Sequence, residues 1–248
     1  MAQVLGTYRY GLPYYYEANS GILPGATVWE QAPLAAYYSD PGAWVHMLED
    51  FEKLTVASNT FGGWTFTAAT SGSGASDATV PNGIYKLDAG AVTANQGVNF
   101  QLNAIPFKLH ATLPTVFEAR LKITQLRLQA LVGLAAIQTA LITSGAVGTD
   151  DKIGFAGVST TGVLSSNTTA SSTATTGTGK TIVASTYYRF GIVATTSLVN
   201  FYVDGSLVSS SSSTIPTAAL SPSFVMQANG TSQPVMHIDY VRVLAPRA

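Results

Sequence analysis

The chain has 248 residues, of which 10% are charged and 46% hydrophobic, and its formal net charge is −1. With no block of lysine and arginine, binding to nucleic acid through phosphate contacts is not expected. The chain contains no cysteine, which excludes disulfides and thiolate sites and fits synthesis in a reducing cytoplasm.

Residues 1–47 are rich in tyrosine and proline and poor in charge, and no helical or alternating period persists in them. Disordered tails usually show the opposite composition, with few aromatics and many charges. We therefore predict an extended N-terminal arm over 1–47, ordered against a partner, with the rest of the chain, 48–248, as one β-sandwich. The alternative is that the arm folds back on its own sandwich and covers a sheet edge.

The aromatic side chains of the arm are the candidate interface residues. A tyrosine or tryptophan brings a large contact area together with a polar group that can form hydrogen bonds. The candidates are Tyr8, Tyr10, Tyr14, Tyr15, Tyr16, Trp29, Tyr37 and Tyr38.

From residue 48 onward, short strands follow one another, separated by turns rich in Gly, Ser and Asn. The clearest is 116–124, where Phe117, Ala119, Leu121 and Ile123 alternate with polar residues. The Asp-Gly pair at 204–205 between two β-forming runs is a strong hairpin signal. This pattern predicts an all-β sandwich or jelly roll, whose core includes Phe117, Leu121, Ile123, Phe190, Ile192, Phe201 and Val203.

Two segments depart from the strand pattern. The Ser/Thr-rich stretch 159–180 is expected to be a long loop or a neutral surface hairpin, and IQTALITS at 137–144 to supply a short helical turn. The apolar stretch 128–143 is too short and too polar to span a bilayer, so no membrane association is expected.

Carboxylates in a pattern typical of glycan cleavage are hard to find. Glycosidases use two carboxylates about 5 to 9 Å apart. Glu118 shares its strand face with Arg120 and Lys122, which predicts a salt-bridged surface row. Asp50 and Glu52 are two residues apart, but an edge strand with polar residues facing water is the simpler interpretation.

Other catalytic and metal-binding patterns are equally weak. His46, His110 and His237 are far apart in the sequence, and no HExxH motif is present. Asp150 and Asp151 are interpreted as a turn, and GTGKT at 177–181 lacks the first glycine of a phosphate-binding loop. We therefore expect no catalytic residue, no metal and no cofactor. Sugar binding by Trp64 and the tyrosines stays open, although aromatics in strands are more often part of the core.

Taken in order, several segments resemble concanavalin A-like jelly-roll domains, and more narrowly the version found in structural proteins of tailed bacteriophage particles. The resemblance covers about 48–246 and is carried by GGWTFTAA, VFEARLKI, DKIGFAGV, the FYVDG hairpin at 201–205 and the IDYVRV strand at 238–243. It implies a jelly-roll β-sandwich. It also implies a catalytic strand of ExDxxE type for members that cleave glycans, and the sequence has none.

This resemblance implies a non-enzymatic capsid decoration (cement) protein. It would be made in the host cytoplasm and located on the phage head, with the major capsid protein or other virion proteins as partners and a homotrimer as the expected assembly. The alternatives are a lectin-like receptor-recognition module of a phage tail or fibre, in which a glycan is the partner, and a glycan-cleaving enzyme of the same fold.

Overall fold

The computed structural model describes residues 4–9, 12–17, 42–51, 60–61, 63–69, 71–77, 83–103 and 107–247. These residues form two antiparallel eight-stranded sheets and two small two-stranded sheets. The predicted all-β jelly-roll sandwich is confirmed. Among the described residues, no helix is long and apolar enough to cross a membrane.

We call the first large sheet the neutral sheet, because none of its strands contains aspartate or glutamate. In spatial order its strands are β15 (Thr173–Thr181), β14 (Val163–Ala170), β13 (Lys152–Ser159), β10 (Leu128–Ala135), β19 (Ser221–Gln227), β8 (Gly97–Leu102), β5 (Trp64–Ala69) and β4 (Thr60–Phe61).

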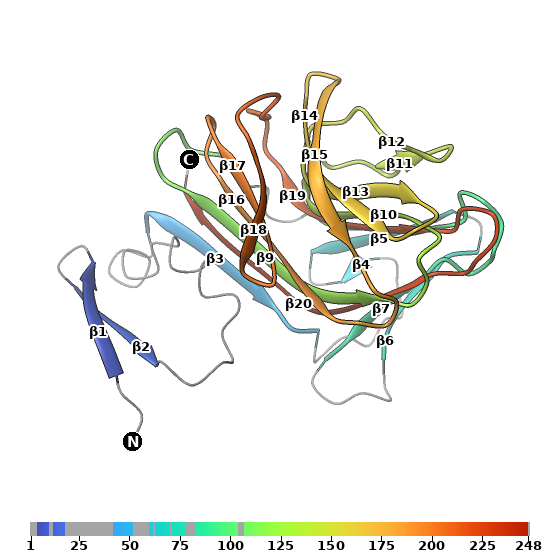
Figure 1. Cartoon of the computed structure of the whole chain (residues 1–248), viewed down its shortest axis with the longest axis horizontal. Coiled ribbons are helices and arrows are strands. Elements are labelled where there is room, and N and C mark those ends of the chain that lie inside the picture. The colour runs from blue at the N-terminus through green and yellow to red at the C-terminus, as the bar shows by residue number, and fades with distance from the viewer. Residues whose placement is uncertain are drawn as a thin grey trace.

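We call the second large sheet the charged sheet, because its strands hold most of the charged residues found in the strands of the two large sheets. Its strands are β18 (Ser206–Ser211), β17 (Val199–Val203), β16 (Tyr188–Ala194), β9 (Thr115–Ile123), β20 (Val235–Pro246), β7 (Tyr85–Asp88) and β6 (Ser73–Ser76), with β3 (Trp44–Glu49) also paired to β20. The two sheets face each other (Figure 1).

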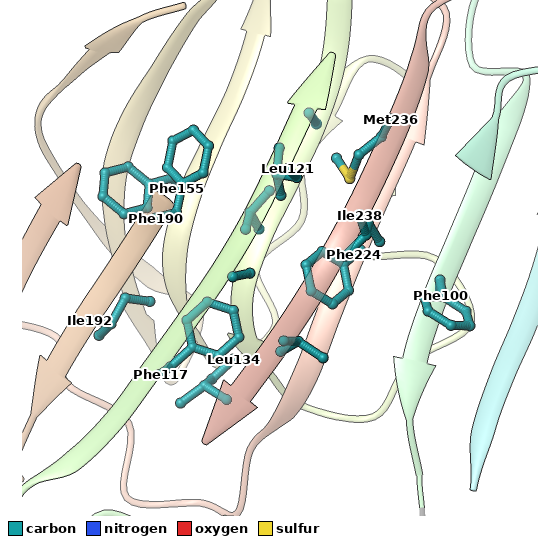
Figure 2. Packing of buried hydrophobic residues seen from close by; sticks show 14 of the residues in the cluster. Phe100, Phe117, Leu121, Leu134, Phe155, Phe190, Ile192, Phe224, Met236 and Ile238 are labelled. Carbon is teal, nitrogen blue, oxygen red and sulfur yellow. The ribbon is translucent and has the colours of Figure 1, made fainter. Parts of the chain in front are cut away.

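The core fills the space between the sheets because alternate residues of each strand point inward. Phe117, Leu121 and Ile123 of β9 are buried at 1% exposure or less, as the alternation predicts. The other predicted core residues, Phe190, Ile192, Phe201 and Val203, are buried as well. Figure 2 shows side chains from both sheets meeting in this layer.

Aromatic rings form two groups inside the core. Trp64 and Phe100 stack with their centroids 4.5 Å apart, and Tyr85 stacks on the same Phe100 at 4.7 Å. At the other end, Phe155 meets Phe190 and Phe201 edge to face, at 5.0 and 5.5 Å. Trp64 is 1% exposed, so it belongs to the core and offers no platform for a sugar.

The two hairpins indicated by the sequence are present. Asp204 and Gly205 both have positive φ, 49° and 80°, which is the backbone of the tight turn that Asp-Gly favours between twisted strands. The Ser/Thr-rich segment forms the β14–β15 hairpin, so the hairpin alternative is the correct one.

Residues 137–144 form no helix. Ile142 and Thr143 are β11, which pairs with β12 (Ala146–Val147). The helical prediction is wrong because Leu141 and Ile142 are buried by packing on the neutral sheet, a contact that local periodicity does not reveal.

In the arm, β1 (Val4–Arg9) and β2 (Leu12–Glu17) pair as an antiparallel hairpin. Four candidate residues, Tyr8, Tyr14, Tyr15 and Tyr16, lie in these strands. Tyr10, Trp29, Tyr37 and Tyr38 lie outside the described residues, as does Glu52. The division into an arm and a sandwich stays a prediction.

Candidate functional site

The two sheets carry different chemistry on their strands. The neutral sheet contains only two charged residues, Lys152 and Lys180. The strands of the charged sheet hold the following ionisable residues: His46, Glu49, Lys86, Asp88, Glu118, Arg120, Lys122, Arg189, His237, Asp239 and Arg242. A ligand on the neutral sheet would therefore meet mainly uncharged hydrogen-bonding groups.

The outer face of the neutral sheet is lined by amide and hydroxyl side chains. On β8, Asn99 and Gln101 alternate with the core residues Val98, Phe100 and Leu102. Neighbouring strands add the following polar residues to the same face: Gln129, Asn167, Ser221, Ser223 and Gln227. Asn99 and Gln101 are only 5% and 2% exposed, so something covers this face.

The cover is the segment 136–149, which we call the crossing segment. Its residues Leu141, Ile142 and Val147 pack on outward-facing apolar side chains of the neutral sheet. Those partners are Leu131, Ala135, Ala156 and Val225. The crossing segment thus lies over the middle of the face, and a hollow remains on each side of it.

The smaller hollow lies between the crossing segment and strands β5 and β8. It has a volume of about 150 Å³ and is lined by Thr65, Thr67, Asn99, Gln101, Asn103, Ile137, Gln138 and Thr139. The Nδ2 of Asn99 donates to the Gln138 carbonyl at 2.7 Å, whereas its buried Oδ1 accepts no hydrogen bond. A buried acceptor without a donor favours a bound water or ligand hydroxyl.

The larger hollow lies between the β11–β12 hairpin and strands β13, β14 and β15. It measures about 470 Å³ and is lined by Gly145, Ala146, Val147, Gly148, Ala156, Gly157, Val158, Val163, Ser165, Asn167, Ala174 and Thr176. This volume is within the range of small-molecule sites, roughly 300–1,000 Å³. Its wall mixes short polar side chains with exposed Val158 and Val163.

A carboxylate and a buried lysine are next to Gly148, one of the lining residues of the larger hollow. A Cβ atom placed on Gly148 would lie 3.1 Å from Oδ2 of Asp150. The Lys152 ammonium is fully buried and donates to the carbonyls of Gly148 and Asp150, the latter at 2.7 Å. Burial lowers the pKa of Lys152, and Asp150 and Asp151 oppose that shift. Lys152 therefore fixes the turn that presents Asp150.

The outer face of the charged sheet differs from the predicted surface row of salt bridges. Glu118 is 4% exposed and accepts a hydrogen bond of 2.8 Å from the Tyr240 hydroxyl. Arg120 pairs with Asp239 and lies 4.2 Å from the centroid of the Tyr187 ring. The register shifts between Ile238 and Tyr240, and such an irregularity re-aims side chains. The simple alternation in the sequence could not reveal it.

The three histidines lie in separate surroundings. The ring of His110 accepts N–H groups from Thr112 and Leu113, and Nδ1 of His237 is 3.5 Å from the Asp77 carboxylate. Burial, followed by the charge of Arg242, lowers the pKa of His46. Across the described part of the chain, no group of three or more His, Cys, Asp or Glu side chains is arranged to hold a metal ion.

Sequence reasoning did not select the neutral face. The signal was present in VNFQL, where amides alternate with large apolar residues. Alternation shows which residues share a face, but it does not show that a distant segment covers that face. The two hollows depend on that long-range contact.

Comparison with solved structures supports the jelly-roll fold. The β-glucanase of Bacillus licheniformis superposes with a TM-score of 0.53 at 14% identity, over 82% of this chain and 98% of the other. The endo-β-1,3-glucanase of Pyrococcus furiosus gives 0.55 at 14% identity, over 83% and 95%. The Crh5 transglycosylase gives 0.54 at 12% identity, over 81% and 84%. At such identities the likeness establishes the concanavalin A-like fold alone.

Sequence comparisons gave no match. No protein-family model matches the chain. No curated protein matches it either.

These neighbours contradict two expectations from the sequence. They do not favour a non-enzymatic capsid decoration protein, because these three structures are glucanases and a transglycosylase. The glycan-cleaving enzyme of the same fold was the less favoured alternative on sequence grounds. The expected homotrimer, the virion partners, the location on a phage head and the interface role of the arm tyrosines stay predictions.

Proposed function

We propose that this protein acts on a neutral polysaccharide, which it binds on the outer face of the neutral sheet. The observation that carries the proposal is the row of uncharged amide and hydroxyl side chains around two hollows on a sheet whose strands have no acidic residue. The glucanase-like fold supports the same class of ligand.

The lining matches the chemistry of an uncharged sugar. Amides and hydroxyls both donate and accept hydrogen bonds, as the hydroxyls of a sugar require. Val158 and Val163, 47% and 36% exposed, offer apolar contact to the C–H face of a ring. An acidic polysaccharide would find few cations here, since Lys152 is buried and bonded to carbonyl groups.

Asp150 is the candidate for proton transfer at a glycosidic bond. Cleavage of such bonds generally depends on carboxylates that donate or accept protons beside the scissile oxygen. The carboxylate of Asp150 is next to Gly148, which lines the larger hollow, and the buried ammonium of Lys152 donates to the backbone carbonyl of Asp150. No strand of the described neutral sheet supplies a second carboxylate, so the turn carrying Asp150 and Asp151 is where we place the reacting groups.

The test combines binding and product formation. The full chain is run through gels containing neutral polysaccharides, with β-1,3-glucan and β-1,3-1,4-glucan included, and is incubated with each polymer. New reducing ends and transfer products are measured by a reducing-sugar assay and mass spectrometry. We expect retention by at least one polymer and products from it.

Two variants make the result specific. Asp150→Asn should abolish the products while leaving retention within about twofold, and Asp239→Asn, a carboxylate on the opposite sheet, should keep both. Retention without any product would contradict the reaction. Neither retention nor product from any polymer would overturn the proposal as a whole.

A further inference from the structure

The crossing segment spans the middle of the neutral face from one hollow to the other. On one side its residues Ile137 and Gln138 form a wall of the smaller hollow. On the other side, Ala146 and Val147 form a wall of the larger one. Between these points Leu141 and Ile142 lie flat on the sheet, 0% and 1% exposed.

Buried amides hold this segment in place. The Nε2 of Gln101 donates to the Ala136 carbonyl at 3.0 Å, and its Oε1 accepts the Gln138 N–H at 2.9 Å. The Nε2 of Gln227 donates to the Ile142 carbonyl at 3.2 Å. A segment with buried apolar contacts and buried hydrogen bonds opens only at a substantial free-energy cost. The crossing segment is therefore a fixed part of the face.

A long polymer cannot pass straight over such a face. A chain that entered from β14 and β15 would fill the larger hollow and then meet the β11–β12 hairpin. The space beyond that obstacle measures about 150 Å³, well below the roughly 300 Å³ at which small-molecule sites begin. The two hollows are thus not one continuous groove.

We infer that the larger hollow receives the end of a neutral glycan chain, with the β11–β12 hairpin as the stop. This inference rests on the proposed function and specifies its substrate as chain ends and short oligosaccharides, not the interior of a polymer. Glycines and alanines occupy half of the lining, at 145, 146, 148, 156, 157 and 174, which leaves room for a sugar ring against the wall.

The experiment uses the full chain and the polysaccharide retained in the gel panel. Oligosaccharides of increasing length from that polymer are titrated by calorimetry. Affinity should stop rising after a few sugar units, since nothing beyond the hairpin can be contacted. In the reaction, viscosity should fall little while reducing ends accumulate, as expected for removal of units from chain ends.

A variant that fills the hollow tests its location. Ala174 is exposed on β15 and lines the larger hollow, so Ala174→Trp should weaken oligosaccharide binding at least tenfold without disturbing the fold. Thr173→Trp, at the exposed neighbouring position on the same strand, whose side chain lies on the opposite face and does not line the hollow, should bind as the unaltered protein does.

The possible outcomes separate this inference from the proposed function. A rapid drop in viscosity, or affinity that keeps rising with chain length, would show that polymer interiors are bound, and would overturn the inference while leaving the function intact. Equal binding by the Ala174→Trp and Thr173→Trp variants would also overturn it. If no polysaccharide is retained at all, the proposed function and the inference fail together.

Discussion

The hydroxyl of Tyr240 on β20 donates a 2.8 Å hydrogen bond to Oε1 of Glu118 on β9, and Glu118 is only 4% exposed. Burial, followed by the charge of Glu118, raises the pKa of Tyr240 far above its ordinary value. The phenol therefore stays protonated and remains a donor throughout the stable pH range. A buried carboxylate needs such a donor, because leaving it without one costs its full desolvation.

Tyr240→Phe should destabilise the protein by about 1.5–3 kcal/mol, because it removes the donor and leaves the carboxylate buried. Glu118→Gln should cost less, since the amide oxygen still accepts from the phenol. Urea unfolding at pH 7 measures both. A Tyr240→Phe variant as stable as the unaltered protein would show that water or another donor solvates Glu118.

His237 should make the protein less stable in mild acid. Burial, followed by the charge of Lys122, lowers its pKa below the ordinary 6.5; Lys86 adds to this, and Asp77 and Asp88 oppose it. The folded state then binds fewer protons than the unfolded state below about pH 6.5. The contribution of His237 to stability is therefore fully present above that pH. It is lost as the pH falls toward the lowered pKa that His237 has in the folded state.

The substitution His237→Gln should flatten this part of the pH profile. The free energy of unfolding is measured by urea titration at steps from pH 7.5 to 5. The unaltered protein should lose stability over this interval, and the variant should lose less. His46, whose pKa is also lowered by burial, still titrates in the variant, so part of the slope should persist. Identical slopes would exclude His237 as a source.

Much of the sandwich follows from short-range patterns. The alternation in β9 identified the core side chains Phe117, Leu121 and Ile123, and the Asp-Gly pair located the β17–β18 hairpin. These features depend on residues adjacent in sequence, where side-chain period and turn chemistry decide the structure.

The candidate site depends on contacts that such patterns do not contain. The sequence around Leu141 and Ile142 predicts a short helical turn, yet both side chains pack on Leu131 of β10 and Val225 of β19. Likewise, the sequence HIDYVRV is typical of a regular strand. In the structure the register shifts near Asp239, and the Asp239 carboxylate lies beside Arg120. Tertiary packing outweighed local preference in both places.

Phe201→Ala tests the packing between the sheets. Phe201 is fully buried, with its ring 5.5 Å from that of Phe155 in an edge-to-face contact. Truncation leaves a cavity, so we expect a loss of about 3–5 kcal/mol in urea unfolding. Leu207→Ala, at a side chain 57% exposed, should stay within about 0.5 kcal/mol. Similar losses in the two variants would contradict this assignment of the core.

Lys152→Met tests the support beneath the proposed site. The buried ammonium donates to the carbonyls of Gly148 and Asp150. Methionine removes the cost of burying the charge, but it leaves both carbonyls without that donor. We expect a net loss of about 1–3 kcal/mol, measured by urea unfolding.

The local readout is hydrogen exchange over residues 148–151, which should become faster in Lys152→Met because the turn is no longer held. Retention on the polysaccharide should weaken as the wall of the larger hollow loosens. Lys180→Met, the other lysine of the neutral sheet, lies 5.5 Å from the centroid of the Tyr188 ring and away from this turn. It should leave exchange at 148–151 unchanged, and faster exchange there in both variants would mean that Lys152 has no special role in fixing Asp150.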